Sequence, residues 1–505
     1  MNRPGEQSRA GVHAHPMGEA SAGRIFIHQV GRSGWQEFGH IGQISRSVFK
    51  LFLSWPFQVR NPSMTHQFPI NDARPLPVLT DITIDGRSKG FPGKLPVTPL
   101  ADIGAKGWNV LRQDLPFPVA VLDIDALNHN SEWIKAVVSH YGVSLCPHGK
   151  TTMAPQLFHR QLADGCWGIT LSTQHQVQTA RHYGIERVFL ANQIMDPVFL
   201  AYIADEQISD PDFDFYFLVD SDEGIDLLQR VALGKSGFRP FQVLIEMGST
   251  DGRTGCRTME KALHLARRIA AIPEVAVLSG IEGFEGAIRG KDVHEIEDRI
   301  VRFLGLMVDV ATAAEKEGLF GGREVLLTAG GSSYFDLVAR VLTKARLASP
   351  TRVVLRSGCY IAHDALMYEE QVARALERSP ELAALAIKPR QALTVWAVVL
   401  SRPADDVLFL NIGRRDVSFD SHLPRLLAYV DTSSSPEVRP LTGSHQTMLL
   451  YDQHANISCS SDSPLRPGML VQLGISHPCT TFDKWDVLSL VDDDHNVVGA
   501  VKTFF

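Results

Sequence analysis

The chain has 505 residues, a net charge of -7 and an apolar fraction of 44%, which is enough chain for two or more domains around a large core. The negative charge and the absence of basic runs with interleaved aromatics argue against a nucleic-acid-binding protein, and no window approaches the roughly 20 apolar residues of a membrane-spanning helix. The six cysteines show no spaced framework, which favours a reducing, cytoplasmic location over a secreted disulfide scaffold.

The first 63 residues differ in character from the rest of the chain. They are rich in Gly, Ser, Arg and His, and their apolar patch at residues 48–53 is too short and too far from the start for a secretory signal. We expect residues 1–63 to be a disordered leader, or to come from a start codon assigned too far upstream, with a transit peptide as the alternative. Residues 64–114 form a pre-barrel segment that we expect to contribute to a β domain.

Residues 115–364 alternate between short apolar runs and segments with helical spacing, such as 154–164 and 260–271. This alternation is typical of a parallel sheet with helical crossovers, and eight strands are the number that a closed (β/α)8 TIM-type barrel requires. An open doubly wound sheet is the alternative. The eight strand-like runs are residues 118–123, 143–146, 168–171, 187–190, 215–219, 243–246, 275–278 and 325–328.

The last part of the chain, residues 365–505, has a different sequence pattern. Apolar runs such as 392–399 and 469–473 are separated by Pro, Gly, Ser and Asp turns, which is typical of β structure. The predicted fold class is therefore α/β, a barrel followed by a C-terminal β domain.

Lys150 stands in the motif Pro147-His148-Gly149-Lys150-Thr151-Thr152, just after a strand-like run. Parallel α/β folds build their active sites at the carboxyl ends of their strands, and an amine shielded from water there can act as a nucleophile toward an aldehyde. The alternative is a solvated surface lysine. His148 either steers the lysine or fills the end of the barrel.

Two glycine-rich turns follow later strands, Ala329-Gly330-Gly331-Ser332-Ser333 and Arg356-Ser357-Gly358-Cys359-Tyr360. Main-chain N–H groups in such turns approach a phosphate closely because glycine has no Cβ, and barrel phosphate sites commonly follow strands seven and eight. A single such motif is usually only a turn. The residues that we predict to bind a phosphate are Gly331, Ser332, Gly358, Cys359 and Tyr360.

His477 and Cys479 form a His-x-Cys pair near the end of the chain. Residues two apart on an extended segment point to the same side, so the imidazole and the thiolate can reach one ion. These two donors favour Zn²⁺ over Mn²⁺ or Mg²⁺. The alternative is an accidental pair with no metal.

These motifs resemble the D-serine dehydratase / D-threonine aldolase group, which are pyridoxal-phosphate enzymes with an alanine-racemase-type barrel. The resemblance runs from about residue 100 to the end of the chain. It implies that Lys150 forms a Schiff base with pyridoxal 5'-phosphate, that the glycine turns hold its phosphate, and that His148, Gln176 and Arg253 contact the cofactor. It also implies a metal on His477 and Cys479, and a homodimer. Because a guanidinium cannot accept a proton, a ring nitrogen facing Arg253 should be unprotonated.

The activity that the resemblance implies is deamination (dehydration) of D-hydroxy amino acids such as D-serine or D-threonine, with Lys150 as general base. Cys479 favours this reaction, since the aldolases of the group usually carry Asp at that position. The alternatives are a D-threonine aldolase and a non-catalytic pyridoxal-phosphate-binding protein. Phe284 departs from the Tyr of many aldolase relatives, Gln176 departs from the Glu of many relatives, and residues 413–420 resemble an active-site segment without an assigned role.

Overall fold

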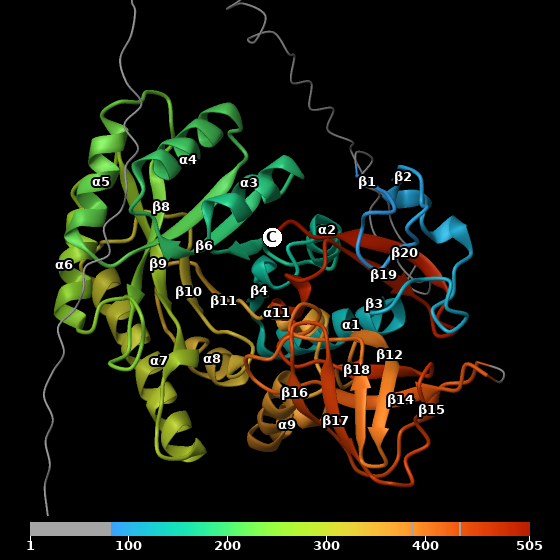
Figure 1. Cartoon of the computed structure of the whole chain (residues 1–505). Coiled ribbons are helices and arrows are strands. Elements are labelled where there is room, and N and C mark those ends of the chain that lie inside the picture. Colours follow the sequence, from blue (N-terminus) through green and yellow to red (C-terminus); the bar gives the residue numbers. More distant parts are fainter. Residues whose placement is uncertain (1–81, 386, 434–435) are drawn as a thin grey trace, which may run out of the picture. The chain divides into compact units, whose positions relative to one another are not determined.

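The computed structural model describes residues 82–385, 387–433 and 436–505. The predicted leader, residues 1–63, lies outside the described residues, as does the start of the pre-barrel segment. Within the described ranges, the chain forms a barrel of parallel strands and an antiparallel β domain (Figure 1), so the predicted fold class is confirmed. No helix in these ranges is both long and apolar enough to cross a membrane.

The barrel consists of eight parallel strands in the order β4-β11-β10-β9-β8-β7-β6-β5. Its strands are β4 (Ser144–Leu145), β5 (Ile169–Leu171), β6 (Arg187–Gln193), β7 (Asp214–Val219), β8 (Phe241–Met247), β9 (Ala276–Gly283), β10 (Val325–Ala329) and β11 (Thr351–Leu355). The first and last strands in this order also meet, because His148 forms a parallel bridge with Thr170 and the Trp167 N–H donates to the Leu145 carbonyl at 2.7 Å. The sheet is therefore closed, as predicted, and is not an open doubly wound sheet.

Helices connect the barrel strands and cover their outer faces (Figure 1). They are α2 (Pro155–Ala163), α3 (Gln174–His182), α4 (Pro197–Ser209), α5 (Asp222–Ala232), α6 (Met259–Ala270), α7 (Val293–Lys316) and α8 (Phe335–Leu342). Most begin at a side-chain cap; Ser221, for example, accepts a hydrogen bond from the Gly224 N–H at the start of α5, which satisfies a donor that the helix leaves free. α1 (Ile124–Tyr141) precedes the barrel, and α9 (Met367–Arg378) and α10 (Pro380–Ala383) follow it.

One predicted barrel strand is wrong. Residues 118–123 form β3 (Val119–Asp123), which pairs with β12 (Leu393–Ala404) and β19 (Val487–Val491) of the β domain. The true eighth barrel strand is β11, whose first two residues, Thr351 and Arg352, are exposed or half-buried. A strand buried on both faces is a run of apolar residues in either sheet. Only its pairing shows whether such a strand belongs to the barrel or to the β domain.

The β domain is a largely antiparallel sheet in the order β15-β14-β18-β12-β13-β17-β16, to which β3, β19 and β20 are added beside β12. The remaining strands are β13 (Val407–Leu410), β14 (Arg425–Val430), β15 (Arg439–Pro440), β16 (His445–Leu450), β17 (Ala455–Cys459), β18 (Leu470–Gly474) and β20 (Val497–Lys502). The described part of the pre-barrel segment carries the hairpin β1 (Thr83–Ile84) and β2 (Thr98–Pro99) and two short 3-10 helices, Leu100–Asp102 and Gly104–Lys106. It joins this sheet at β20, where the Val497 N–H donates to the Trp108 carbonyl at 2.8 Å.

The interior of the barrel changes from apolar to polar toward the carboxyl ends of the strands. Buried apolar side chains fill its centre, among them Leu244, Leu326 and Val354. Because successive side chains on one face of a strand are two residues apart, the next inward positions are Glu246, Thr328 and Arg356, and all three are buried. The polar layer marks the end of the barrel where a reaction site can be built.

Candidate active site at the carboxyl ends of the barrel strands

Lys150 lies where the sequence predicts it, immediately beyond the first barrel strand. β4 runs into a short 3-10 helix, η3 (Gly149–Thr151), and the lysine side chain is exposed at the barrel mouth. Packing requires glycine before it, since a Cβ at Gly149 would stand 2.8 Å from Ile169 Cγ2 and 2.9 Å from Phe158. The turn is thus pressed against the barrel wall while its amine stays accessible.

His148 is the half-buried neighbour of this lysine. Burial, and next the positive charge of Lys150, holds the pKa of the imidazole well below its usual range. The ring is therefore neutral, and its Nδ1 is buried without a hydrogen-bond partner among the described residues. A neutral ring beneath the lysine fits either predicted role of His148, because it fills the barrel end and adds no positive charge there.

The two glycine turns follow β10 and β11; β11 lies between β10 and β4 in the barrel. The Ser357 hydroxyl joins them by donating to the Gly331 carbonyl at 2.9 Å. A Cβ at Gly358 would lie 2.5 Å from the His148 carbonyl oxygen and 2.8 Å from Thr151 Oγ1. The second turn therefore fits against the lysine turn only as glycine, which leaves the close main-chain approach that a phosphate requires.

The other predicted phosphate residues are placed differently from one another. The thiol of Cys359 is buried near Ser332, at the start of η5 (Cys359–Ile361). The Tyr360 side chain is fully buried and its hydroxyl accepts from Gln161 Nε2 at 3.3 Å. A contact from Tyr360 to a cofactor would therefore come from its main chain.

Two further predicted cofactor residues already have local partners. Gln176 helps to cap the start of α3, where its Oε1 accepts from the Ser172 N–H at 2.8 Å and its own N–H donates to the Thr173 hydroxyl. Arg253, in the loop after β8, is exposed and stacks over the Phe284 ring at 4.7 Å. Phe284 in turn faces Gly331, since a Cβ there would lie 3.3 Å from its ring, so the guanidinium lies near the first glycine turn.

His477 and Cys479 meet at the start of α11 (Cys479–Phe482), which follows β18. The extended segment that we expected is wrong: His477 has a left-handed φ of 54° and Pro478 is already helical. Hydrogen bonding to Cys479, with a smaller contribution from Asp420, raises the pKa of His477 to about 9. The neighbouring Cys359 and then His477 hold the pKa of Cys479 well below its usual range.

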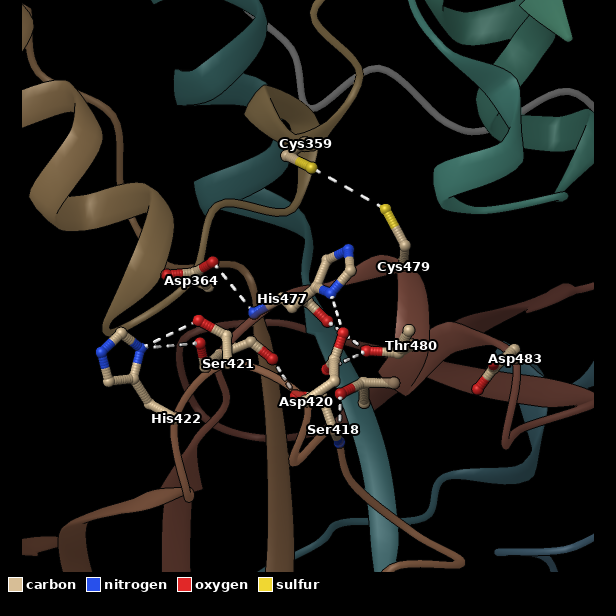
Figure 2. A network of polar contacts seen from close by, with 12 residues as sticks. Cys359, Asp364, Ser418, Asp420, Ser421, His422, His477, Cys479, Thr480 and Asp483 are labelled. Carbon is tan, nitrogen blue, oxygen red and sulfur yellow. Dashed lines mark hydrogen bonds and ion pairs between the residues drawn. The ribbon is translucent and has the colours of Figure 1, made fainter. Parts of the chain in front are cut away.

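Asp420 orients the imidazole (Figure 2). Its Oδ2 lies 2.5 Å from His477 Nδ1, and its Oδ1 accepts from the Thr480 hydroxyl at 2.8 Å. A carboxylate on Nδ1 leaves Nε2 to face other partners, which is the usual arrangement of a metal-binding histidine. Sequence reasoning noted residues 413–420 without a role; the separation of 57 residues between Asp420 and His477 gave no local spacing by which to find the pair.

The metal-donor pair and the lysine turn lie side by side. The Cys479 thiol is 3.4 Å from Thr151 Oγ1 and 3.9 Å from Cys359 Sγ (Figure 2). α11 of the β domain thus touches both η3 and η5 of the barrel. Within the described ranges, the side chains hold no group of three or more His, Cys, Asp or Glu residues arranged around a metal position, so the fit to a metal rests on the imidazole nitrogen and the sulfur.

A buried arginine–glutamate pair lies inside the barrel just below these turns, and sequence reasoning did not single it out. Arg356 pairs with Glu282, and its guanidinium also donates to Thr328 Oγ1 at 3.1 Å. Burial raises the pKa of Glu282 to about 8. The pair sets the polar floor of the site, and Arg356 leads directly into the second glycine turn.

Comparison with known proteins yields two family matches. The alanine racemase N-terminal domain family matches residues 122–320, and the family described as "Putative serine dehydratase domain" matches residues 392–491. The chain is 24% identical over 226 residues to 3-hydroxy-D-aspartate aldolase of Paracoccus denitrificans (strain Pd 1222), covering 44% of this chain and 56% of the relative. It is 26% identical over 293 residues to D-threo-3-hydroxyaspartate dehydratase of Delftia sp. (strain HT23), covering 56% and 71%.

The match thus spans little more than half the length of the aldolase relative. A solved structure with the same fold is a cysteine-to-alanine mutant of D-threo-3-hydroxyaspartate dehydratase in the metal-free form. It superposes with a TM-score of 0.60 at 18% identity, covering 79% of this chain and 99% of that one.

Proposed function

We propose that this chain, which belongs to the D-serine dehydratase / D-threonine aldolase group of alanine-racemase-type barrel proteins, dehydrates D-hydroxy amino acids such as D-serine or D-threonine to a 2-oxo acid and ammonia. The observation that carries the proposal is the 3.4 Å contact between Cys479 Sγ and Thr151 Oγ1. It sets a metal donor beside the turn of Lys150. Loss of a β-hydroxyl needs a base at Cα and an acid at the neighbouring Cβ, within the length of one small substrate.

The glycine turns and Lys150 fit pyridoxal phosphate, which when bound delocalises the negative charge that develops at the α-carbon of an amino acid. The main-chain N–H groups around Ser332 and Gly358 would hold the phosphate. Lys150 Nζ would bind the aldehyde until the amine of the substrate takes its place there, and the released lysine amine would then take the α-proton of the substrate. His148, held neutral by burial, would position the lysine without repelling it.

His477 and Cys479 fit Zn²⁺, since they offer an imidazole nitrogen and a thiolate and Asp420 fixes the ring. Zn²⁺, when bound, acts as a Lewis acid toward a substrate hydroxyl. Mn²⁺ and Mg²⁺ suit oxygen donors better than a thiolate.

The rival reaction is aldol cleavage, and one relative is named as an aldolase. Product analysis with D-threonine separates the two. Dehydration gives ammonia and 2-oxobutyrate, whereas aldol cleavage gives glycine and acetaldehyde. Because both relatives are named for 3-hydroxyaspartate, both enantiomers of serine, threonine and 3-hydroxyaspartate should be tested. Release of glycine from D-threonine would overturn the proposal in favour of the aldolase.

Two variants test the assigned roles. Lys150→Ala should abolish both the visible absorption of bound cofactor and turnover. Cys479→Ala should keep the visible absorption but lose bound metal and dehydration. Cys459→Ser is the matched control, because Cys459 is a buried thiol of the same domain whose sulfur contacts the Asp405 carbonyl, at 3.7 Å. Full activity of Cys479→Ala in the presence of a chelator would exclude the zinc role.

A further inference from the structure

Cys359 and Cys479 come from different parts of the fold and meet sulfur to sulfur. Cys359 begins η5, in the glycine turn after the last barrel strand, and Cys479 begins α11 of the β domain. Their Sγ atoms are 3.9 Å apart and both are free thiols. The proposed function uses Cys479 as a metal donor and gives Cys359 only a main-chain contact with phosphate, so the Cys359 thiol has no role there.

The separation of the two sulfurs is the one that a shared metal ion demands. Zn–S bonds are about 2.3 Å long, and at a tetrahedral angle two thiolates on one zinc lie about 3.8 Å apart. The measured 3.9 Å matches this value and is far longer than the roughly 2.05 Å of a disulfide. A simple contact between two thiols can have the same separation, so the test must count the sulfurs bound to the metal.

The donor set that we assigned to zinc is one ligand short. Catalytic zinc sites usually have three protein ligands and one open position for water or substrate, whereas His477 and Cys479 supply two. Cys359 is the cysteine nearest to this pair. The three side chains are not arranged around one metal position among the described residues, so the inference rests on the separation of the two sulfurs.

We propose that Cys359 is a third protein ligand of the metal, beside His477 and Cys479. The proposal rests on the zinc role in the proposed function. It leaves one position for the substrate hydroxyl, and it ties the phosphate-binding turn of the barrel to the metal site of the β domain through one ion. Loss of Cys359 should therefore weaken metal binding and loosen the contact between η5 and α11.

The test counts sulfur neighbours of the metal directly. The full-length wild type, Cys359→Ala, Cys359→Ser and the control Cys459→Ser are purified with a phosphine reductant, loaded with Zn²⁺ and measured by X-ray absorption at the zinc edge; loading with Co²⁺ reports thiolate ligands by their charge-transfer absorption. We expect two sulfurs per zinc in the wild type and in Cys459→Ser, and one in the Cys359 variants. Their zinc affinity should fall by more than about tenfold, the lower limit for losing even an outer partner of a zinc ligand.

One sulfur per zinc in the wild type would overturn the proposal, and the wild-type spectrum decides this even if neither Cys359 variant folds. Unchanged zinc affinity in folded Cys359→Ala would overturn it as well. The failure of the proposed function looks different. A wild type that holds zinc through one sulfur and still dehydrates D-serine removes only the role of Cys359, whereas a wild type that binds no metal removes both.

Discussion

The carboxylate of Asp420 offers the sharpest test of the metal site, because it touches no predicted substrate or cofactor position. Its Oδ2 holds His477 Nδ1 at 2.5 Å and its Oδ1 accepts from the Thr480 hydroxyl at 2.8 Å. Asp420→Ala removes both interactions and frees the imidazole to rotate. Asp420→Asn keeps one oxygen that can still accept from Nδ1, so its effect should be smaller.

The magnitude follows from the role of such partners at other metal sites. Removing the group that orients a metal-binding histidine costs about tenfold to 100-fold in metal affinity, or about 1.4–2.8 kcal/mol. Competition with a chelating dye measures the zinc dissociation constant of each variant. Asp452→Ala is the control, since that exposed carboxylate pairs with Arg415, at 3.7 Å. A dissociation constant in Asp420→Ala equal to that of the wild type would refute the metal role of His477.

Two further predictions concern the barrel. Gly358→Ala should destabilise the fold by about 1–3 kcal/mol, as overpacking does, because the added Cβ would lie 2.5 Å from the His148 carbonyl oxygen. The same change should weaken binding of pyridoxal phosphate. Thermal unfolding and a cofactor titration measure the two effects, with Gly93→Ala as the control because a Cβ at Gly93 would meet open space. The wild type should lose stability relative to Glu282→Gln between pH 5 and 8. The folded protein keeps the Glu282 proton up to about pH 8, whereas the unfolded chain releases it near pH 4.5. The contribution of Glu282 to the free energy of unfolding is therefore fully present below pH 4.5 and is lost as the pH rises to about 8. The same change of melting temperature with pH in both proteins would contradict this prediction.

The sequence predicted the barrel mouth better than it predicted the polar contacts around it. Lys150 and the glycine turns could be placed because each follows an apolar run directly, and the carboxyl ends of parallel strands meet at one edge. The misassigned strand β3 shows the limit, since buried strands look alike until their partners are known. Gln176 shows another limit, because a capping role and a cofactor contact call for the same amide.

The metal pair was predicted for a reason that the structure corrects. On an extended segment, side chains two residues apart point to the same side and would align the two donors. In the structure, His477 instead has a left-handed backbone conformation and precedes a short helix. A non-glycine residue in that conformation costs of order 1–3 kcal/mol and persists only where its surroundings fix it. The surroundings are two carboxylates far away in sequence: Asp364 accepts from the His477 N–H at 3.2 Å, and Asp420 binds the ring.

These two carboxylates show how the site is assembled across the fold. Asp364 follows the last barrel turn and also accepts from the N–H groups of Leu366 and Tyr368 at 2.9 and 2.8 Å, so it is fixed where the barrel ends and the β domain begins. Asp420 lies on the β domain itself. The geometry of the His-x-Cys motif is therefore set by long-range contacts, and the same three letters elsewhere would not place an imidazole beside a thiol. The motif lies between the two halves of the molecule, against the turn that carries Lys150, and this position supports the metal site that we propose.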